Sequence, residues 1–325
     1  MAQTKDVSLS VVIPVYNEAD GLTAFHEALL AVLLPLKLTA ELIYCDDGST
    51  DTTAELIQAW VKTQTPQLTI RLVALSRNFG KENALTAGIA HAKGQAIITL
   101  DGDGQHPVEL IPQFLEKWRL GAKVVVGVRQ TNDGQTFSKR LLSKLFYFTF
   151  NRLTPQKLVP GSTDFRLIDQ TVQQEFLRLQ ETDRLTRGLI DWLGFKAAYI
   201  SFIPKPRGAG KPTYSTRKLV NLALNSIVSL SPVPLHLFAY LGFFITMGTF
   251  LLGLTICLEQ FILRDPWHWR ISGNALLSVL VLFLLGVVLL SQGLLSLYVS
   301  HIHNQTKQRP LYVIDRERSA GISNN

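Results

Sequence analysis

The stretch of sequence that decides the fold is AIITLDGDGQHP, residues Ala96–Pro107. Its first half is an apolar run of strand character that stops at two carboxylates, Asp101 and Asp103, each followed by a glycine. A buried strand that ends in this way carries both acids at its C-terminal edge, which is where ligands bind in open α/β sheets. Two carboxylates there suit a hard divalent cation that also binds a diphosphate. The plainer alternative is a surface Asp-Gly turn.

Three more strand-like segments precede this one. Apolar runs near residues 9–14, 40–45 and 70–74 alternate with helical patterns near 21–34, up to 61, and 82–92. The second run also ends in acid, at Asp46 and Asp47. Strands that alternate with helices are typical of doubly wound α/β domains, so the first 110 residues are predicted to form a Rossmann-like, mostly parallel sheet.

Hydrophobic residues make up 47% of the 325 residues and crowd into the C-terminal third. Residues 235–258 and 272–300 carry no formal charge. Each stretch exceeds the roughly 20 apolar residues that cross a bilayer as a helix. We therefore expect a two-helix transmembrane hairpin, with spans at about 235–258 and 274–300. A pair of buried core helices is the alternative.

These features divide the chain into four parts. Residues 1–215 are expected to form a cytosolic domain, 216–231 a juxtamembrane amphipathic helix, 232–301 the two transmembrane helices and 302–325 a cytosolic C-terminal tail. The strand pattern starts at Leu9, so no signal peptide is expected after Met1. Lys and Arg flank the pair of spans more densely than the loop between them, which predicts that both termini are cytosolic.

The net charge of +7 is concentrated in the middle of the chain. Residues 111–230 hold 19 Lys and Arg against 8 Asp and Glu. A basic segment that adjoins a hydrophobic hairpin favours lipid phosphate over nucleic acid as its partner. The only two cysteines, Cys45 and Cys257, exclude a disulfide framework or a zinc cluster. No dinucleotide-binding glycine motif follows the first strand and no Walker-type motif is present, which argues against a dinucleotide enzyme or an NTPase.

Four segments, taken in order, resemble the signature of family 2 glycosyltransferases with the GT-A fold. They are VIPVYNE at 12–18, DDGSTD at 46–51, RNFGK at 77–81 and DGDGQHP at 101–107. Within that family, the set is similar to the polyprenyl-phosphate hexosyltransferases, namely dolichyl-phosphate mannose synthases and bactoprenol glucosyltransferases. The similarity continues through TDFRL at 163–167 and ends with the pair of apolar spans, which is typical of the bactoprenol enzymes.

The resemblance implies an inverting transfer of a hexose from a nucleotide sugar to a polyprenyl phosphate at the cytosolic membrane face. UDP-glucose is the first choice of donor and GDP-mannose the second. It also implies Mg²⁺ or Mn²⁺, with Asp101 and Asp103 as ligands and Gln105 completing the shell. Gln105 can instead cap the next helix.

Further residues match the donor-binding positions of the family. The nucleotide-sugar set is Pro14, Tyr16, Glu18, Asp46, Asp47, Lys81, Asp101, Gly102, Asp103, Arg207 and Lys211. The plainer alternatives are helix capping for Glu18 and Asp47 and core packing for Tyr16. In the basic loop PRGAGKPTY, Lys211 lies two places earlier than the family's usual lysine, so Arg207 is the safer assignment.

The acceptor phosphate needs cations to position it, and Arg129, Lys139 and Arg140 lie in the appropriate segment. Residues 137–153 show the pattern of an interfacial helix, with an ordinary amphipathic core helix as the alternative. Asp164 either orients the substrates or acts as a base, against the alternative of a buried ion pair with Arg166. The predicted catalytic set is therefore Asp103, Asp164 and Arg129.

A different class of function is a sugar-nucleotide-binding scaffold or transporter subunit. Two spans are too few to line a hydrophilic path unless the chain oligomerises, and a homo-oligomer through the transmembrane region is expected. The paired carboxylates at two strand ends favour an enzyme.

Overall fold

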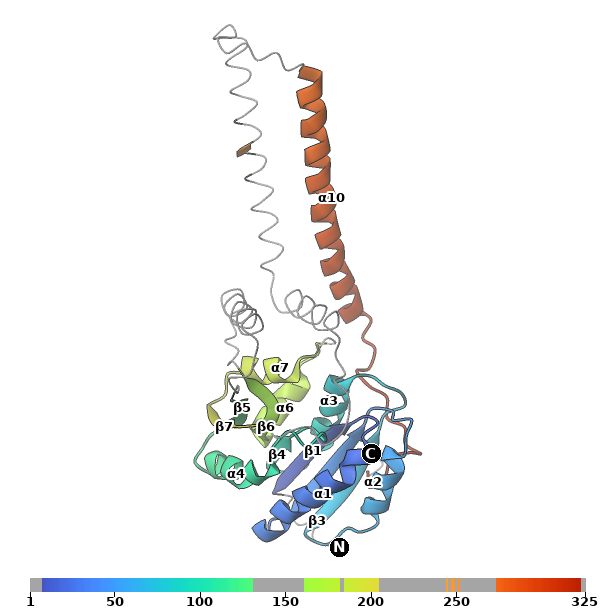
Figure 1. Ribbon diagram of the computed structural model, residues 1–325, viewed down its shortest axis with the longest axis vertical. Coiled ribbons are helices and arrows are strands. Elements are labelled where there is room, and N and C mark those ends of the chain that lie inside the picture. The colour runs from blue at the N-terminus through green and yellow to red at the C-terminus, as the bar shows by residue number, and fades with distance from the viewer. Residues whose placement is uncertain are drawn as a thin grey trace. The chain divides into compact units, whose positions relative to one another are not determined.

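The computed structural model describes residues 8–130, 161–181, 184–204 and 273–322, together with residues 244, 247, 248 and 251 (Figure 1). The chain divides into two units. One comprises Met1–Thr213 and Arg309–Asn325, and the other comprises Tyr214–Gln308. The predicted helix at 137–153, the juxtamembrane helix at 216–231 and nearly all of the first span lie outside the described residues.

The first unit is built on a seven-stranded sheet with the order β3-β2-β1-β4-β6-β5-β7. Its strands are β1 (Leu9–Val15), β2 (Ala40–Asp46), β3 (Leu68–Ala74), β4 (Ala96–Thr99), β5 (Val124–Arg129), β6 (Ser162–Asp169) and β7 (Ala197–Phe202). All neighbouring pairs are parallel except those that involve β6, which runs antiparallel to both β4 and β5. The predicted α/β class and the four predicted strands are confirmed, and the sheet is mixed.

Helices cover both faces of the sheet. On one face lie α1 (Ala19–Leu33), α2 (Thr53–Val61) and α4 (Ile111–Arg119), and on the other lie α3 (Lys81–His91), α6 (Gln170–Arg178) and α7 (Thr186–Trp192). Short 3₁₀ turns occupy Leu34–Leu36 and Val108–Leu110. The result is a three-layer α/β/α domain.

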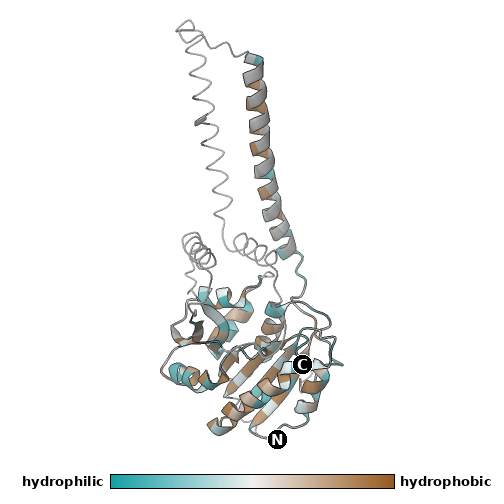
Figure 2. Ribbon diagram, viewed as in Figure 1, coloured by the Kyte–Doolittle hydropathy of each residue, from teal (hydrophilic) through white to brown (hydrophobic). Residues whose placement is uncertain are grey.

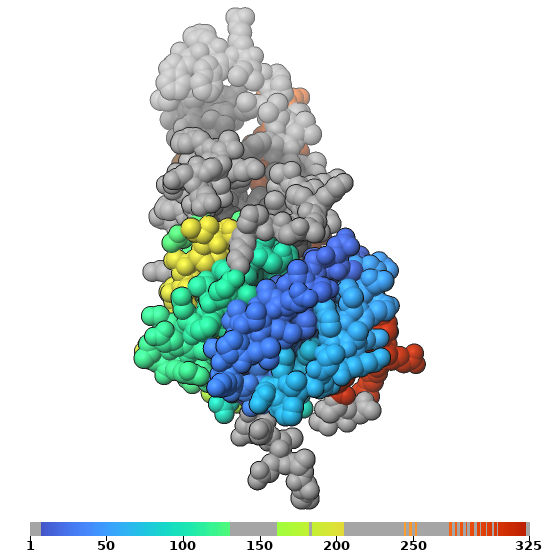
Figure 3. All heavy atoms as spheres, turned by 60° about the horizontal axis from the view of Figure 1, so that its bottom comes forward, coloured from blue at the N-terminus to red at the C-terminus, as the bar shows by residue number. Residues whose placement is uncertain are grey.

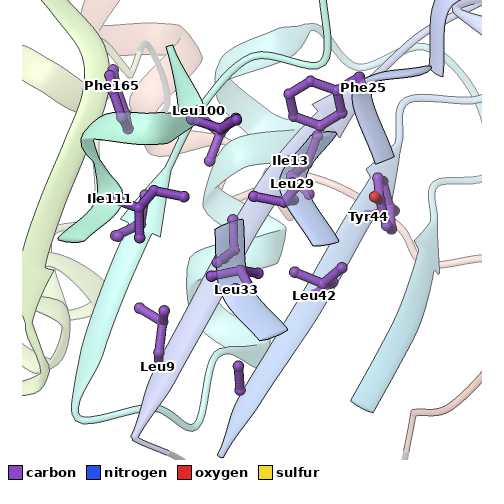
Figure 4. Close-up of a cluster of buried hydrophobic side chains, with 14 of the residues drawn as sticks. Leu9, Ile13, Phe25, Leu29, Leu33, Leu42, Tyr44, Leu100, Ile111 and Phe165 are labelled. Atoms are coloured by element: carbon purple, nitrogen blue, oxygen red, sulfur yellow. The ribbon is translucent and has the colours of Figure 1, made fainter. Parts of the chain in front are cut away.

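The central strands are buried on both faces, which explains their almost continuous hydrophobic sequences. In β1, Val11 and Ile13 face the α1 side, whereas Val12 faces α3. Figure 4 shows the first of these two cores, where Leu29 and Leu33 of α1 meet strand residues such as Leu42. Hydropathy colouring shows the same division, with brown strands beneath helices that carry teal on their outer sides (Figure 2).

The C-terminal residues 309–322 belong to this first unit, where they pair with the edge strand β3 through isolated antiparallel bridges. Figure 3 shows the red atoms of this segment against the domain's edge, next to the light blue of residues near 50–75. The sequence predicted only a cytosolic tail for residues 302–325. The structure shows that most of the tail is part of the folded domain.

The second unit contains the helix α10 (Gly273–Thr306), which contains the predicted second span. Its 34 residues would extend about 50 Å at the usual rise of an α-helix. A search of the described residues for apolar helices long enough to cross a membrane finds one stretch, Ala19–Leu36. That stretch contains α1, whose Leu22, Phe25 and Leu29 are buried against the sheet, as expected of a core helix.

Candidate functional site

The candidate site lies at one edge of the sheet, where the order of the strands reverses. The chain proceeds from β1 outward to β2 and β3, and then returns to place β4 on the other side of β1. Loops that leave neighbouring parallel strands in opposite directions open a crevice at their carboxyl ends, which is the usual ligand position in such folds. The loops after β1, β2 and β4 therefore converge here, and all three carry predicted site residues.

Hydrogen bonds join the loop after β1 to the loop after β2. The backbone N–H of Asn17 donates to Ser49 Oγ at 3.0 Å, and that of Glu18 donates to Thr53 Oγ1 at 3.0 Å. In return, the Asn17 side chain accepts from the backbone N–H of Thr50 at 2.9 Å. The loop that carries Pro14, Tyr16 and Glu18 is thereby held in place, with Tyr16 43% exposed.

Asp46 and Asp47 are both buried and both organise backbone. Asp46 Oδ1 accepts from the N–H of Ser49 at 3.0 Å. Asp47 accepts from the N–H groups of Phe79 (2.7 Å) and Gly80 (2.9 Å), and so fixes the start of α3. Burial raises the pKa of each carboxyl group, although these hydrogen bonds oppose the shift. The capping role that the sequence left open for Asp47 is not observed: α2 and α3 both begin without a side-chain cap, and Asp47 instead anchors the residues just before α3.

Lys81 connects two of the predicted site residues, Asp101 and Asp164. Its ammonium nitrogen lies 2.6 Å from Asp101 Oδ1 and 2.7 Å from Asp164 Oδ2. The antiparallel register pairs Thr99 with Arg166. Asp101 comes two residues after Thr99 and Asp164 two residues before Arg166, so the two acids lie at the same edge of the sheet. The hydroxyl of Thr99 also donates to the backbone oxygen of Asp164 at 2.6 Å.

This cluster favours the charged forms of Lys81 and Asp164. Burial opposes the charge on Lys81, but the carboxylates of Asp101 and Asp164 outweigh it and raise the pKa of the ammonium group. Burial likewise opposes the charge on Asp164, and the cations Lys81, Arg187 and Arg166 lower its pKa below the ordinary range. The alternative of an Asp164–Arg166 pair is wrong, because Arg166 forms a bidentate pair with Asp191 at 2.6 and 3.2 Å.

The turn after β4 is shaped by its small and buried residues. A Cβ on Gly102 would lie 3.3 Å from a Val15 methyl group, so this position faces the core and places the flanking carboxylates outward. Asp103 and Gln105 are partly exposed, and Asp103 Oδ1 accepts from the backbone N–H of Gln105 at 3.1 Å. Neither the 3₁₀ turn Val108–Leu110 nor α4 receives a side-chain hydrogen bond at its N-cap, so Gln105 does not cap the next helix.

His106 is a structural residue of the site to which the sequence assigned no role. Its Nδ1 accepts from the backbone N–H of Asp101 at 3.1 Å, and its ring stacks on Phe165. Burial lowers the pKa of the imidazole, which keeps the acceptor nitrogen free of a proton. His106 therefore holds the backbone of the first carboxylate in position.

The donor set at this edge fits Mg²⁺ or Mn²⁺. Asp101 and Asp103 supply carboxylate oxygens and Gln105 an amide oxygen, which are the ligand types that these hard cations take. Among the described residues, no group of three or more His, Cys, Asp or Glu side chains converges to hold a metal. A cation here would therefore depend on substrate phosphates and water for the rest of its ligands.

The remaining predicted residues are distributed as follows. Arg129 ends β5, exposed, at the same sheet edge, and its backbone N–H donates to Gly161 O at 2.8 Å. Lys139, Arg140, Arg207 and Lys211 lie outside the described residues. Arg318, which the sequence placed in the tail, contacts Asp46 at this edge. No signal in the linear sequence connects those two residues, because 272 positions separate them.

Comparisons with known proteins find the same family that the sequence motifs indicate. The family model for glycosyl transferase family 2 matches residues 10–177, just over half of the chain. An uncharacterized glycosyltransferase of Synechocystis is 39% identical over 95% of this chain and 95% of its own length. A bactoprenol glucosyl transferase of Shigella phage SfV is 33% identical over 96% and 99%.

Among solved structures, the chain is similar to a mannosyltransferase from Pyrobaculum calidifontis in complex with GDP-Man and Mn²⁺. The TM-score is 0.46 at 20% identity, over 64% of this chain and 59% of that one.

Proposed function

Since the chain belongs to glycosyl transferase family 2, we propose that it transfers a hexose from a nucleotide sugar to a polyprenyl phosphate at the cytosolic face of a membrane. The chain is a glycosyltransferase of the GT-A type, and the donor, acceptor and location are the proposal. The observation that carries it is the cluster of Lys81, Asp101 and Asp164 at the strand-order reversal, with Asp103 beside it.

UDP-glucose is the proposed donor. The near-complete overlap with a relative named bactoprenol glucosyl transferase supports glucose. The nucleoside would lie over the joined loops after β1 and β2, where Tyr16 is exposed and where Pro14, Glu18, Asp46 and Asp47 are placed. The diphosphate would then point toward Asp101 and Asp103 at the end of β4.

A divalent cation held by Asp101 and Asp103, with Gln105 nearby, would neutralise the charge that develops on the leaving diphosphate. Lys81 adds a positive charge from the protein side, and its ammonium group, 2.6 Å from Asp101 Oδ1, holds that carboxylate in place. Between Asp101 and Asp103, Gly102 faces Val15, so a side chain at this position would press on the core beneath the two carboxylates.

The acceptor requires little help from a base. The second pKa of a phosphate monoester is near 6, so a polyprenyl phosphate is mostly a dianion at cytosolic pH and already nucleophilic. Asp164 is held ionised by Lys81, and we assign it to the orientation of the sugar or acceptor. Arg129, with Lys139 and Arg140, would hold the acceptor phosphate; Arg207 and Lys211 would close over the donor.

Membrane attachment is proposed through two spans at about 235–258 and 274–300. The C-terminal residues 309–322 belong to the same folded unit as the strand that starts at Leu9. Any membrane-spanning segment between them must therefore cross an even number of times. The uncharged sequence of α10 up to Ser300 and its length support one of the two crossings.

The test is an assay of the purified full-length protein with labelled UDP-glucose, UDP-GlcNAc and GDP-mannose, each with undecaprenyl phosphate and Mg²⁺ or Mn²⁺. Thin-layer chromatography should show a labelled lipid product with UDP-glucose. A product only with GDP-mannose would identify the mannose alternative. Nucleotide-sugar binding without transfer to any lipid would instead support a scaffold and overturn the proposal.

A further inference from the structure

The C-terminal segment Arg309–Ile322, here called the clasp, extends the sheet beyond β3. Leu72 and Ala320 exchange backbone hydrogen bonds at 2.9 and 3.0 Å, and the N–H of Asp315 donates to Ala74 O at 2.8 Å. Ser319 Oγ also accepts from the N–H of Ala74 at 3.0 Å. The clasp thus covers backbone groups that an edge strand would otherwise leave unpaired.

Side chains of the clasp pack into both cores. Tyr312, Ile314 and Ile322 pack against the core on the α3 side, and Ala320 packs against the α1 side. Gly321 has a φ of +74°, and a Cβ there would lie 3.0 Å from Ile70 O, so only glycine allows this close approach. These contacts place the clasp accurately enough for one of its side chains to serve a site.

That side chain is Arg318. Asp315 Oδ1 accepts from the N–H of Arg318 at 3.2 Å, and Gln58 of α2 donates to Arg318 O at 2.9 Å. From this fixed backbone, Arg318 Nη2 donates to Ser49 O at 3.1 Å and to Asp46 Oδ2 at 3.3 Å. Asp46 is fully buried at the C-terminal end of β2, whereas the Arg318 side chain is 37% exposed.

We propose that the clasp is part of the donor site and that Arg318 is a positioning residue of its nucleoside end. Arg318 holds the carboxylate of Asp46 and the backbone of Ser49 in the arrangement that receives the nucleoside. The inference rests on the proposed function, because that function places a nucleoside over these loops. It adds a residue from the far end of the chain to a site otherwise built from the first 211 residues.

The electrostatics require such a partner. A fully buried carboxylate is unfavourable in its ionised form unless a cation or several donors compensate for the lost water. Asp46 receives the hydroxyl and the N–H of Ser49 and faces the negative charge of Asp51, while Arg318 supplies the compensating positive charge. Without Arg318, the carboxylate would take up a proton or turn away, and the Ser49 turn would lose an anchor.

The first experiment measures UDP binding to the purified full-length protein by calorimetry. Arg318→Ala should weaken UDP binding about tenfold to a hundredfold, as expected for loss of hydrogen bonds to charged groups. Arg318→Lys should recover part of the loss, because it keeps the charge and loses the planar fork. Arg316→Ala is the matched control, since Arg316 is exposed and has no ion pair within the described chain.

Two measurements separate a positioning role of Arg318 from general destabilisation: the KM values for the two substrates and the pH dependence of UDP binding. Arg318→Ala should raise the KM for the nucleotide sugar and leave the KM for polyprenyl phosphate unchanged. The pH below which UDP binding fails should also move upward, because Arg318 lowers the pKa of Asp46 while Asp51 raises it. If Arg318→Ala does not fold, Arg318→Gln, which retains length and one donor, replaces it.

Two results would overturn the inference. If the wild-type protein binds UDP and Arg318→Ala binds it equally well or more tightly, the clasp has no part in the donor site and the proposed function stands. If the wild-type protein binds neither UDP nor GDP, the proposed function itself fails, and the inference fails with it.

Discussion

The ammonium nitrogen of Lys81 lies 2.7 Å from Asp164 Oδ2, although the two residues are 83 positions apart. Lys81 begins α3, and Asp164 lies in the antiparallel strand β6. Asp101 completes the cluster at 2.6 Å from the same nitrogen. One lysine therefore balances two carboxylates from neighbouring strands, and the cluster has consequences for both stability and catalysis.

Lys81→Met should destabilise the protein, because it removes the cation that lies between Asp101 and Asp164. It should also reduce kcat/KM for transfer by at least tenfold. The double variant Lys81→Met with Asp164→Asn should recover most of the thermal stability but not the activity. Differential scanning fluorimetry of both variants checks the first point. Melting of the double variant at the same temperature as the single one would contradict the pairing.

Asp103→Asn should abolish metal-dependent transfer while leaving the melting temperature of the ligand-free protein nearly unchanged. The reason is that Asp103 is partly exposed and its Oδ1 accepts from the backbone N–H of Gln105, which an amide oxygen can also do. The measurement is transfer with and without EDTA, alongside a thermal melt. Transfer that persists in EDTA in the wild-type protein would remove the metal assignment.

Arg129→Ala should raise the KM for polyprenyl phosphate, or lower kcat, and leave UDP binding unchanged. A lost charge-assisted contact is worth roughly 1.5–3 kcal/mol, which is about a tenfold to hundredfold loss in kcat/KM. Arg119→Ala is the control, because Arg119 is exposed and precedes β5 at the opposite sheet edge. Equal losses for donor and acceptor would place Arg129 on the diphosphate instead.

Stability should fall as the pH drops from about 6.5 toward 4, because of His26. This imidazole stacks on Trp60 with ring centroids 4.0 Å apart, and its Nδ1 lies 2.7 Å from the Tyr44 hydroxyl. Burial lowers its pKa from 6.5 to about 4. The unfolded chain therefore binds the proton more readily, which costs the folded state about 3 kcal/mol once the pH is below 4.

His26→Gln should reduce the difference in melting temperature between pH 7.5 and pH 4.5. His91→Gln, at the partly exposed end of α3, should leave that difference as it is in the wild type. A wild-type melting temperature that does not change over this range would show that His26 does not control it.

A reporter fused after Asn325 should be cytosolic, because the clasp packs on the same sheet as the N-terminal strand. The measurement is reporter activity in intact cells. An extracytoplasmic reporter on a correctly folded protein would exclude both the even number of crossings and the proposed leaflet.

The sequence by itself determined the α/β class, the four strands that end at site loops and the paired acids at two of those ends. These features follow from local causes: buried strands of a parallel sheet are continuously apolar, and the residues after them must turn. The family could also be inferred, because four short segments in a fixed order are far more specific than one. Asp101, Asp164 and Lys81 were all predicted as site residues, but the pairing of Lys81 with both carboxylates was not.

Only the tertiary structure decided which charges face each other. Arg166 lies two residues from Asp164 on β6 yet pairs with Asp191, because the packing of α7 against β6 brings that carboxylate within reach. The clasp is a further case. Its pairing with β3 and the contact between Arg318 and Asp46 depend on an edge strand being available, and a sheet's edge exists only once the strand order is set.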